Sequence, residues 1–157
     1  MNEVLERLRD AQNRHDLDAF VACFDPHYRS EQPLHPDRTL VGREQVDKNW
    51  AEVFAGVPDF HAELLRWADR GDTGWAEWHW HGTRTDGTRL DMRGVTIFGI
   101  REDRIVWGRL YLEDVEGGQG DRPGRPTHGS GIRVGLRPSH GRVRHHLCRV
   151  NASIATS

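Results

Sequence analysis

Two hydrophobic periods divide the first part of the chain. Before Pro58, apolar side chains recur every three or four positions, the spacing of amphipathic helices. Asp16 is a candidate N-cap and Pro26 a stop for the second of these helices. The stretch over 27–41 holds two prolines and is predicted to be irregular or to form a short extended segment. The pattern predicts three helices, at about 3–14, 16–25 and 43–55.

After Pro58 the period shortens to two, and segments rich in Trp, Ile, Val, Leu, Phe and Thr alternate with turn-forming clusters. Asp86-Gly87 is the strongest hairpin signal in the chain. Three helices packed on one face of a curved antiparallel sheet give an α+β domain, with a pocket where helices and sheet diverge. The pattern predicts a four-stranded meander, with strands at 60–69, 75–84, 90–101 and 104–113.

The composition changes at residue 116. The first 116 residues contain every Trp, Phe and Tyr, and 15 Lys and Arg against 23 Asp and Glu, a net charge of −8. The last 41 residues contain 7 Arg, 8 Gly, a single acid and no aromatic residue, a net charge of +6. Ordering a backbone costs about 1–2 kcal/mol per residue, which so few large apolar side chains do not offset. We therefore predict a domain over 1–116 and a disordered basic tail over 117–157.

The same composition excludes several classes of protein. The chain has no apolar run long enough to span a membrane, and its charged N-terminus lacks the apolar core of a signal peptide. Cys23 and Cys148 show neither zinc-site spacing nor a disulfide framework, so a cytoplasmic protein without membrane contact is expected.

The basic tail leaves three interpretations open. Its arginines can contact phosphates, but it has no aromatic side chain for base stacking, so binding to nucleic acid is not expected. A flexible tail with another role is the second interpretation. The third is a tail without a selected role, produced by a frameshift or an altered stop codon in a GC-rich gene.

Several short segments carry a family resemblance: Ala19–Phe24, Gly42–Trp50, Gly82-Thr83 with Asp86-Gly87, Arg93–Ile100 and Arg104–Glu113. Together with the order of elements, they make residues 3–116 resemble the SnoaL-like branch of the nuclear transport factor 2-like superfamily. The resemblance implies a cone-shaped, cystatin-like fold, no cofactor, and a homodimer formed through the outer sheet face. Members include ketosteroid isomerases, polyketide cyclases, epoxide hydrolases, dehydratases and non-catalytic binders, so the fold does not fix the function.

The last predicted strand places Arg109, Tyr111 and Glu113 on one face. If this face looks into the cone, burial would suit Glu113 to acid or base work near neutral pH. The resemblance agrees, because a catalytic acid of epoxide hydrolases and cyclases falls at this position. Arg109 and Tyr111 would orient it or stabilise negative charge, and His35 would complete a proton shuttle. The alternative is an exposed salt bridge at the rim.

Aromatic residues form a second set of candidates. Trp78 and Trp80 share a face of their strand and, with Trp50, would form the wall of a pocket for a largely apolar ligand. Tyr28 and Gln32, near the expected pocket mouth, are further ligand-binding candidates. Epoxide hydrolases have an Arg-x-Asp pair where this chain has Trp78 and Trp80, so their way of activating water is not expected. Core packing alone is the other explanation for these tryptophans.

The opposite face of the same strand carries His79 and His81, with Glu77 beside them. Such histidines bind a metal ion when a neighbouring strand supplies a third ligand, for example His61 or Glu63. Two ligands from one strand are a weak signal, so no metal site is predicted and this face is expected at the surface or at a subunit interface.

The sequence thus predicts a small-molecule-binding protein that performs cofactor-free acid/base catalysis of the isomerase, cyclase or hydrolase kind on a largely apolar substrate. The alternative is a non-catalytic ligand-binding or subunit-assembly module. Whether the chain is an enzyme stays open at this point.

Overall fold

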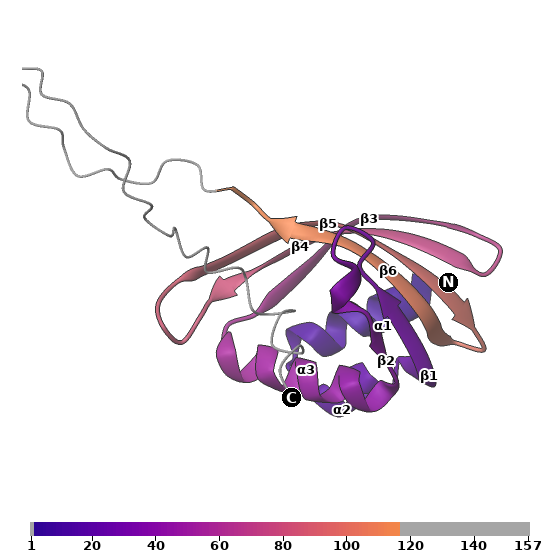
Figure 1. Cartoon of the computed structure of the whole chain (residues 1–157), viewed down its shortest axis with the longest axis horizontal. Helices are drawn as coiled ribbons and strands as arrows, with labels where there is room; N and C mark the ends of the chain where they lie inside the picture. Colours follow the sequence, from indigo (N-terminus) through magenta and orange to yellow (C-terminus); the bar gives the residue numbers. More distant parts are fainter. Residues whose placement is uncertain (1, 117–157) are drawn as a thin grey trace, which may run out of the picture.

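Three helices pack against one face of a curved sheet in the computed structural model, which describes residues 2–116 (Figure 1). The predicted tail over 117–157 lies outside the described residues. In the described part of the chain, no helix is long and apolar enough to cross a membrane. The helices are α1 (Asn2–Asn13), α2 (Leu17–Val21) and α3 (Arg43–Gly56), with a short 3-10 helix, η1 (Pro36–Arg38). The strands are β1 (Phe24–Glu31), β2 (Leu40–Val41), β3 (His61–Arg70), β4 (Thr73–Thr83), β5 (Arg89–Arg101) and β6 (Arg104–Asp114).

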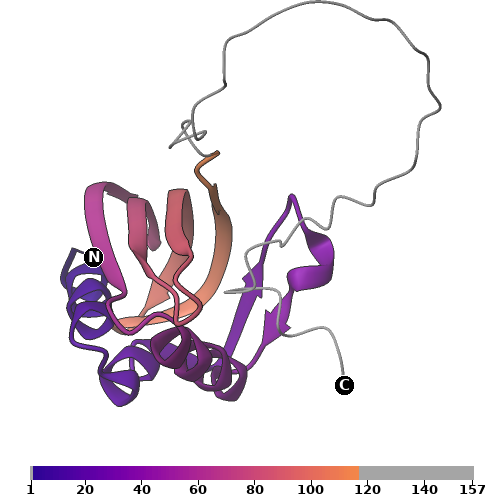
Figure 2. The same ribbon diagram turned by 90° about the vertical axis from the view of Figure 1, so that its left-hand side faces the viewer.

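The first and third predicted helices form where their apolar spacing places them. The second, α2, ends at Val21, short of the predicted stop at Pro26, because β1 already begins at Phe24. On α1, Val4, Leu5 and Leu8 lie on one buried stripe. Asp16 caps α2 as predicted, since its carboxylate accepts a hydrogen bond from the backbone N–H of Ala19 at 3.0 Å. In Figure 2 the helices lie together along one side of the strands. The layered α+β arrangement therefore follows from the stripes that the sequence shows.

The described part of the sheet has six strands, where the sequence predicted four. The strand order is β2-β1-β6-β5-β4-β3, and the predicted meander is its β3–β6 portion. β1 pairs parallel with β6 and antiparallel with β2. Pro26 hid β1 in the sequence, because proline lacks the N–H that a central strand needs. It is tolerated since the pairing of β1 with β6 is irregular between Phe24 and Arg29.

The inner face of the sheet and the helices enclose the core. On β4, Ala76, Trp78 and Trp80 point toward the helices and are at most 4% exposed. Residues that alternate with these point to the opposite, outer face of the sheet, as the two-residue period of a strand requires. The outer face therefore carries the polar half of each strand, including His79 and His81.

Gly94 allows the inner strands to approach closely. It pairs with Trp78 on β4 and with Leu112 on β6, and its φ is +156°. A Cβ at this position would overlap the carbonyl oxygen of Tyr111. The wide indole of Trp78 therefore lies opposite the one residue type without a side chain.

We expect Gly94→Ala to lower the free energy of unfolding by about 1–3 kcal/mol, because the added methyl group forces β5 and β6 apart. Gly56→Ala is the matched control, since a Cβ at the end of α3 meets no atom within 4 Å. That change is expected to raise stability by about 0.5–1 kcal/mol. Urea unfolding measures both variants, and an equal effect of the two substitutions would contradict the packing argument.

Candidate ligand-binding cavity

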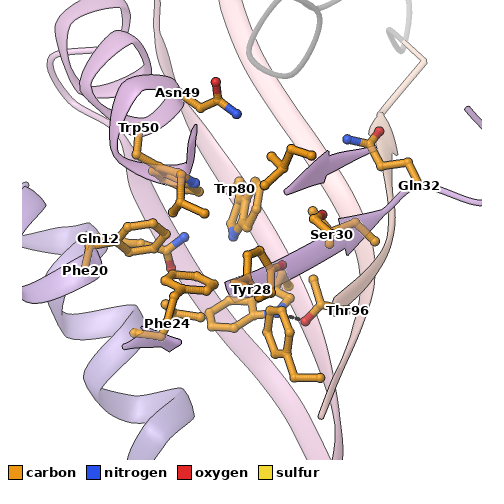
Figure 3. Close-up of a pocket in the computed structure, with 16 residues that line it drawn as sticks. Gln12, Phe20, Phe24, Tyr28, Ser30, Gln32, Asn49, Trp50, Trp80 and Thr96 are labelled. Atoms are coloured by element: carbon orange, nitrogen blue, oxygen red, sulfur yellow. Dashed lines mark hydrogen bonds between the residues drawn. The ribbon is translucent and has the colours of Figure 1, made fainter. Parts of the chain in front are cut away.

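A cavity lies between the helices and the inner face of the sheet, bordered by β1 (Figure 3). Its free volume is about 50 Å³. One water molecule needs about 10–15 Å³ on the same measure, so the cavity holds a few non-hydrogen atoms as it stands, and a ring of the size of phenol once its side chains move apart. Its aromatic lining residues are Phe20, Phe24, Tyr28, Trp50, Trp78, Trp80 and Phe98.

The aromatic rings of the lining brace one another across the helix–sheet boundary. The ring centroids of Phe20 on α2 and Trp50 on α3 are 4.3 Å apart. Trp50 meets Trp80 on β4 edge to face, with centroids 5.5 Å apart and an interplanar angle of 80°. Such edge contacts stabilise aromatic pairs beyond their burial and fix ring orientation. The wall of the cavity is therefore built before any ligand arrives.

Two polar side chains point into this apolar space without a protein partner. Gln12 on α1 is 1% exposed, and neither its amide nitrogen nor its amide oxygen has a hydrogen-bond partner among the described residues. The same holds for Nε1 of Trp80. By contrast, Nε1 of Trp78 donates to Oγ1 of Thr96 at 2.9 Å. Figure 3 shows Gln12 and Trp80 facing the same part of the cavity.

Leaving a buried polar group unpaired costs about 1–3 kcal/mol. The orientation of Gln12 and Trp80 is therefore not explained by stability. The Gln12 amide offers a hydrogen-bond donor and an acceptor, and the Trp80 indole offers a second donor. Together they complement a small polar group on a ligand.

Tyr28 contributes a phenol to the opposite wall. Burial raises the pKa of Tyr28, and a hydrogen bond with Ser30 opposes the shift only in part. The phenol is therefore protonated at neutral pH and is able to donate a hydrogen bond. A side chain at Gly108 would collide with the hydroxyl of Tyr28, since a Cβ there would lie 2.5 Å from the oxygen.

The cavity is electrically neutral. Besides Gln12, Trp80 and Tyr28, its polar lining residues are Ser30, Gln32, Asn49 and Thr96. None of its lining residues is an acid, a histidine, a lysine or an arginine. The cavity thus binds by shape and hydrogen bonding.

All five residues predicted to contact a ligand line this cavity. They come from α3, β4 and β1 and from the residue that follows β1: Trp50, Trp78, Trp80, Tyr28 and Gln32. The sequence placed Trp78 and Trp80 on one face of β4 by the two-residue period, and the structure shows that this face meets the helices.

The expectation that the polar face of β6 looks into the cone is wrong. Leu110 lines the cavity and Leu112 is buried, so the alternate residues Arg109, Tyr111 and Glu113 face the other way. The period of two fixes which side chains share a face, but not which face meets the helices. The face of β6 that carries Leu110 and Leu112 is the one that packs toward the helices.

The predicted pair of His35 and Glu113 does form, outside the cavity. Nε2 of His35 lies 2.7 Å from Oε1 of Glu113, and the side chains are 32% and 52% exposed. The contact ties the loop between β1 and β2 to the end of β6. Nearby, Nε of Arg109 lies 3.7 Å from Oε2 of Glu31. The structure thus joins two catalytic candidates at the surface and separates all four from the cavity lining.

The sequence analysis missed Gln12 and Asn49. Gln12 follows Leu8 by four positions and so continues the buried stripe of α1. A glutamine on an apolar stripe is the signal that would have found it, because polar residues are seldom fully buried without a purpose. Asn49 sits on the inner face of α3, where its amide oxygen accepts a hydrogen bond from Gln45 at 3.0 Å.

Comparisons with known proteins agree with the fold. The SnoaL-like domain model matches residues 5–107. Many solved structures are similar to the chain, among them the following three. A Catenulispora acidiphila protein with a ketosteroid isomerase-like fold, in complex with trimethylamine, has a TM-score of 0.62 at 19% identity, covering 69% of this chain and 84% of its own.

The second is a Jannaschia protein provisionally named a SnoaL-like polyketide cyclase, with a TM-score of 0.60 at 21% identity, covering 71% of this chain and 83% of its own. The third, a provisional hydroxylase from Streptomyces galilaeus, has a TM-score of 0.62 at 15% identity, covering 71% of this chain and 74% of its own. No match to a curated protein was found. At these identities the likeness confirms the predicted fold and leaves the activity to the site itself.

The buried phenol makes alkaline stability a test of the cavity. An unfolded tyrosine loses its proton near pH 10, whereas folded Tyr28 keeps it, so the folded state binds more protons than the unfolded state. We expect the free energy of unfolding to fall as pH rises above about 10, by at most about 1.4 kcal/mol per pH unit. Urea unfolding from pH 8 to pH 11 measures it. Tyr28→Phe should lose this component and the control Tyr111→Phe should keep it; parallel curves for all three proteins would contradict the burial.

Proposed function

Since the chain belongs to the SnoaL-like domain family, we propose that it binds a small, uncharged, largely apolar molecule in the cavity between its helices and sheet. The observation that carries the proposal is the pair of unpartnered polar groups, the Gln12 amide and the Trp80 indole N–H, inside an aromatic wall. They are the two groups that a bound ligand would satisfy.

The arrangement specifies the ligand's polar group. The N–H groups of Trp80 and Gln12 donate, and Oε1 of Gln12 accepts. A hydroxyl group on the ligand complements both, because its oxygen accepts and its O–H donates. The apolar remainder of the ligand would lie against Phe20 and Trp50, whose rings form the wall next to Gln12.

The charge of the protein and the size of the cavity restrict the class of ligand further. Burying an unpaired ion is costly, and the lining offers no opposite charge. The net charge of −8 on residues 1–116 disfavours anions in addition. The Catenulispora protein, which is similar in fold, was solved in complex with trimethylamine, a molecule of four non-hydrogen atoms.

Binding, rather than catalysis, is what the cavity supports best. Acid/base chemistry needs a group that exchanges a proton near neutral pH. The one titratable lining residue, Tyr28, has its pKa moved further from neutrality by burial. We therefore favour the ligand-binding module over the acid/base enzyme.

Phenol and toluene test the proposal as a matched pair, since they differ only in a hydroxyl against a methyl group. We expect phenol to quench or shift the fluorescence of the cavity tryptophans with a dissociation constant at least about tenfold lower than that of toluene, the worth of one to two hydrogen bonds. Tryptophan fluorescence titration measures both.

Gln12→Leu keeps the size of the side chain and removes its polar atoms. It should abolish the preference for phenol while leaving toluene binding intact, and it should raise the free energy of unfolding by about 1–3 kcal/mol. Failure of both probes to bind the wild-type protein, or an unchanged preference in Gln12→Leu, would overturn the proposal.

A second candidate function rests on the 2.7 Å contact between His35 and Glu113. A histidine beside a carboxylate is an arrangement that moves protons, and it would give acid/base catalysis at the surface, by the loop that joins β1 and β2.

Exchange of the α-protons of an enolisable ketone such as acetophenone for deuterium, followed by NMR, tests this second function. Wild-type protein should accelerate exchange, and Glu113→Gln and His35→Gln should each reduce that acceleration by about 100-fold or more. The control is Glu31→Gln, a neighbouring carboxylate that does not contact His35. Equal exchange rates for the three variants and the wild type would rule the pair out as a catalyst.

A further inference from the structure

A cluster of metal-binding side chains lies on the outer face of the sheet, at the paired ends of β3 and β4. His61 lies directly across from His81, and Glu63 lies across from His79. One possible ligand atom each from His61, Glu63 and His81 falls within 4.8 Å of the others. Imidazole nitrogens and a carboxylate oxygen are the donor set that Zn²⁺ prefers besides thiolate.

The distances approach those of an occupied site. Zinc–ligand bonds of about 2.0–2.2 Å at tetrahedral angles separate neighbouring ligand atoms by about 3.3–3.6 Å. Nε2 of His81 already lies 3.3 Å from Oε1 of Glu63. His61 is exposed at the surface, and its ligand atom lies within 4.8 Å of those of Glu63 and His81. Two of the three ligand atoms therefore already have the separation that a bound ion requires, and the third lies close to both.

A second layer of contacts holds Glu63 in place. Nδ1 of His79 lies 3.3 Å from Oε2 of Glu63, and Nε2 of His79 lies 2.8 Å from Oδ1 of Asp91. Both ring nitrogens of His79 are thus engaged by carboxylates, which leaves Oε1 of Glu63 directed toward His81. Outer contacts of this kind, which orient a ligand, commonly change metal affinity by about 10–100-fold.

We propose that His61, Glu63 and His81 form a binding site for a divalent transition-metal ion of the zinc type, with its fourth position open to solvent. His79 and Asp91 act as positioning residues. The site lies on the opposite face of the sheet from the cavity, so it is independent of the proposed function. It also revises the expectation from the sequence that this face carries no metal.

Isothermal titration with Zn²⁺ and the visible spectrum with Co²⁺ test the site in the 157-residue chain. The sequence beyond residue 116 contains further metal-binding side chains, so the reference protein carries five substitutions there: His128→Ala, His140→Ala, His145→Ala, His146→Ala and Cys148→Ser. In this reference we expect one Zn²⁺ per chain, and Co²⁺ bands as intense as those of four- or five-coordinate sites.

His61→Ala and His81→Ala should each weaken Zn²⁺ binding at least about 100-fold, because each removes a direct ligand. His79→Ala should weaken it by about tenfold, as a positioning residue does. The matched control is His27→Ala, an exposed strand histidine outside the cluster, which should bind as the reference does. Circular dichroism checks that each variant is folded, above all His79→Ala, whose side chain is 13% exposed. Zn²⁺ binding that is absent from the reference, or that is equal in His61→Ala, His81→Ala and His27→Ala, would overturn the proposal.

Discussion

The packing of β4 against the helices is the constraint on which the rest of the structure depends. Trp78 and Trp80 are inserted on the helix side, where Trp80 meets Trp50 of α3 and Phe60 in edge-to-face contacts. Because side chains alternate along a strand, the inward orientation of Trp78 and Trp80 places His79 and His81 on the outer face of the sheet. One packing event thus creates an aromatic cavity on one face of the sheet and a polar, histidine-rich surface on the other.

The cavity contains buried polar groups that lower the stability of the protein. A leucine at position 12 would extend the apolar stripe of α1 and cost nothing in unpaired hydrogen bonds. The chain instead places an amide there, against an indole N–H that also has no partner among the described residues. Natural proteins keep such local conflicts mainly where a function requires them. The neutral, hydrogen-bonding character of the cavity follows from this choice more than from the aromatic wall.

Sequence periodicity predicted the helices, the meander and the aromatic lining because each depends on a local spacing of apolar residues. It failed where the answer depended on distant contacts. β1 was missed because Pro26 argues against a strand, and only its irregular pairing with β6 makes the proline acceptable. Glu113 was assigned to the wrong face because the two-residue period of β6 does not say which of its two faces meets the helices. Gln12 was overlooked because a single polar residue on a helix is ordinary until its burial is known.

The parallel pairing of β1 with β6 has a consequence for how the chain reaches its native state. β1 borders the cavity through Tyr28 and Ser30, yet it joins the meander only through the strand that comes last in the described chain. The loop that this contact closes is most of the domain, and closing large loops slows folding. During synthesis β1 therefore has no partner in the meander until residues 104–109 have left the ribosome. A chain stopped before that point leaves edges of β1 and β5 unpaired, so completion of the last strand is also the step that removes two sites of possible aggregation.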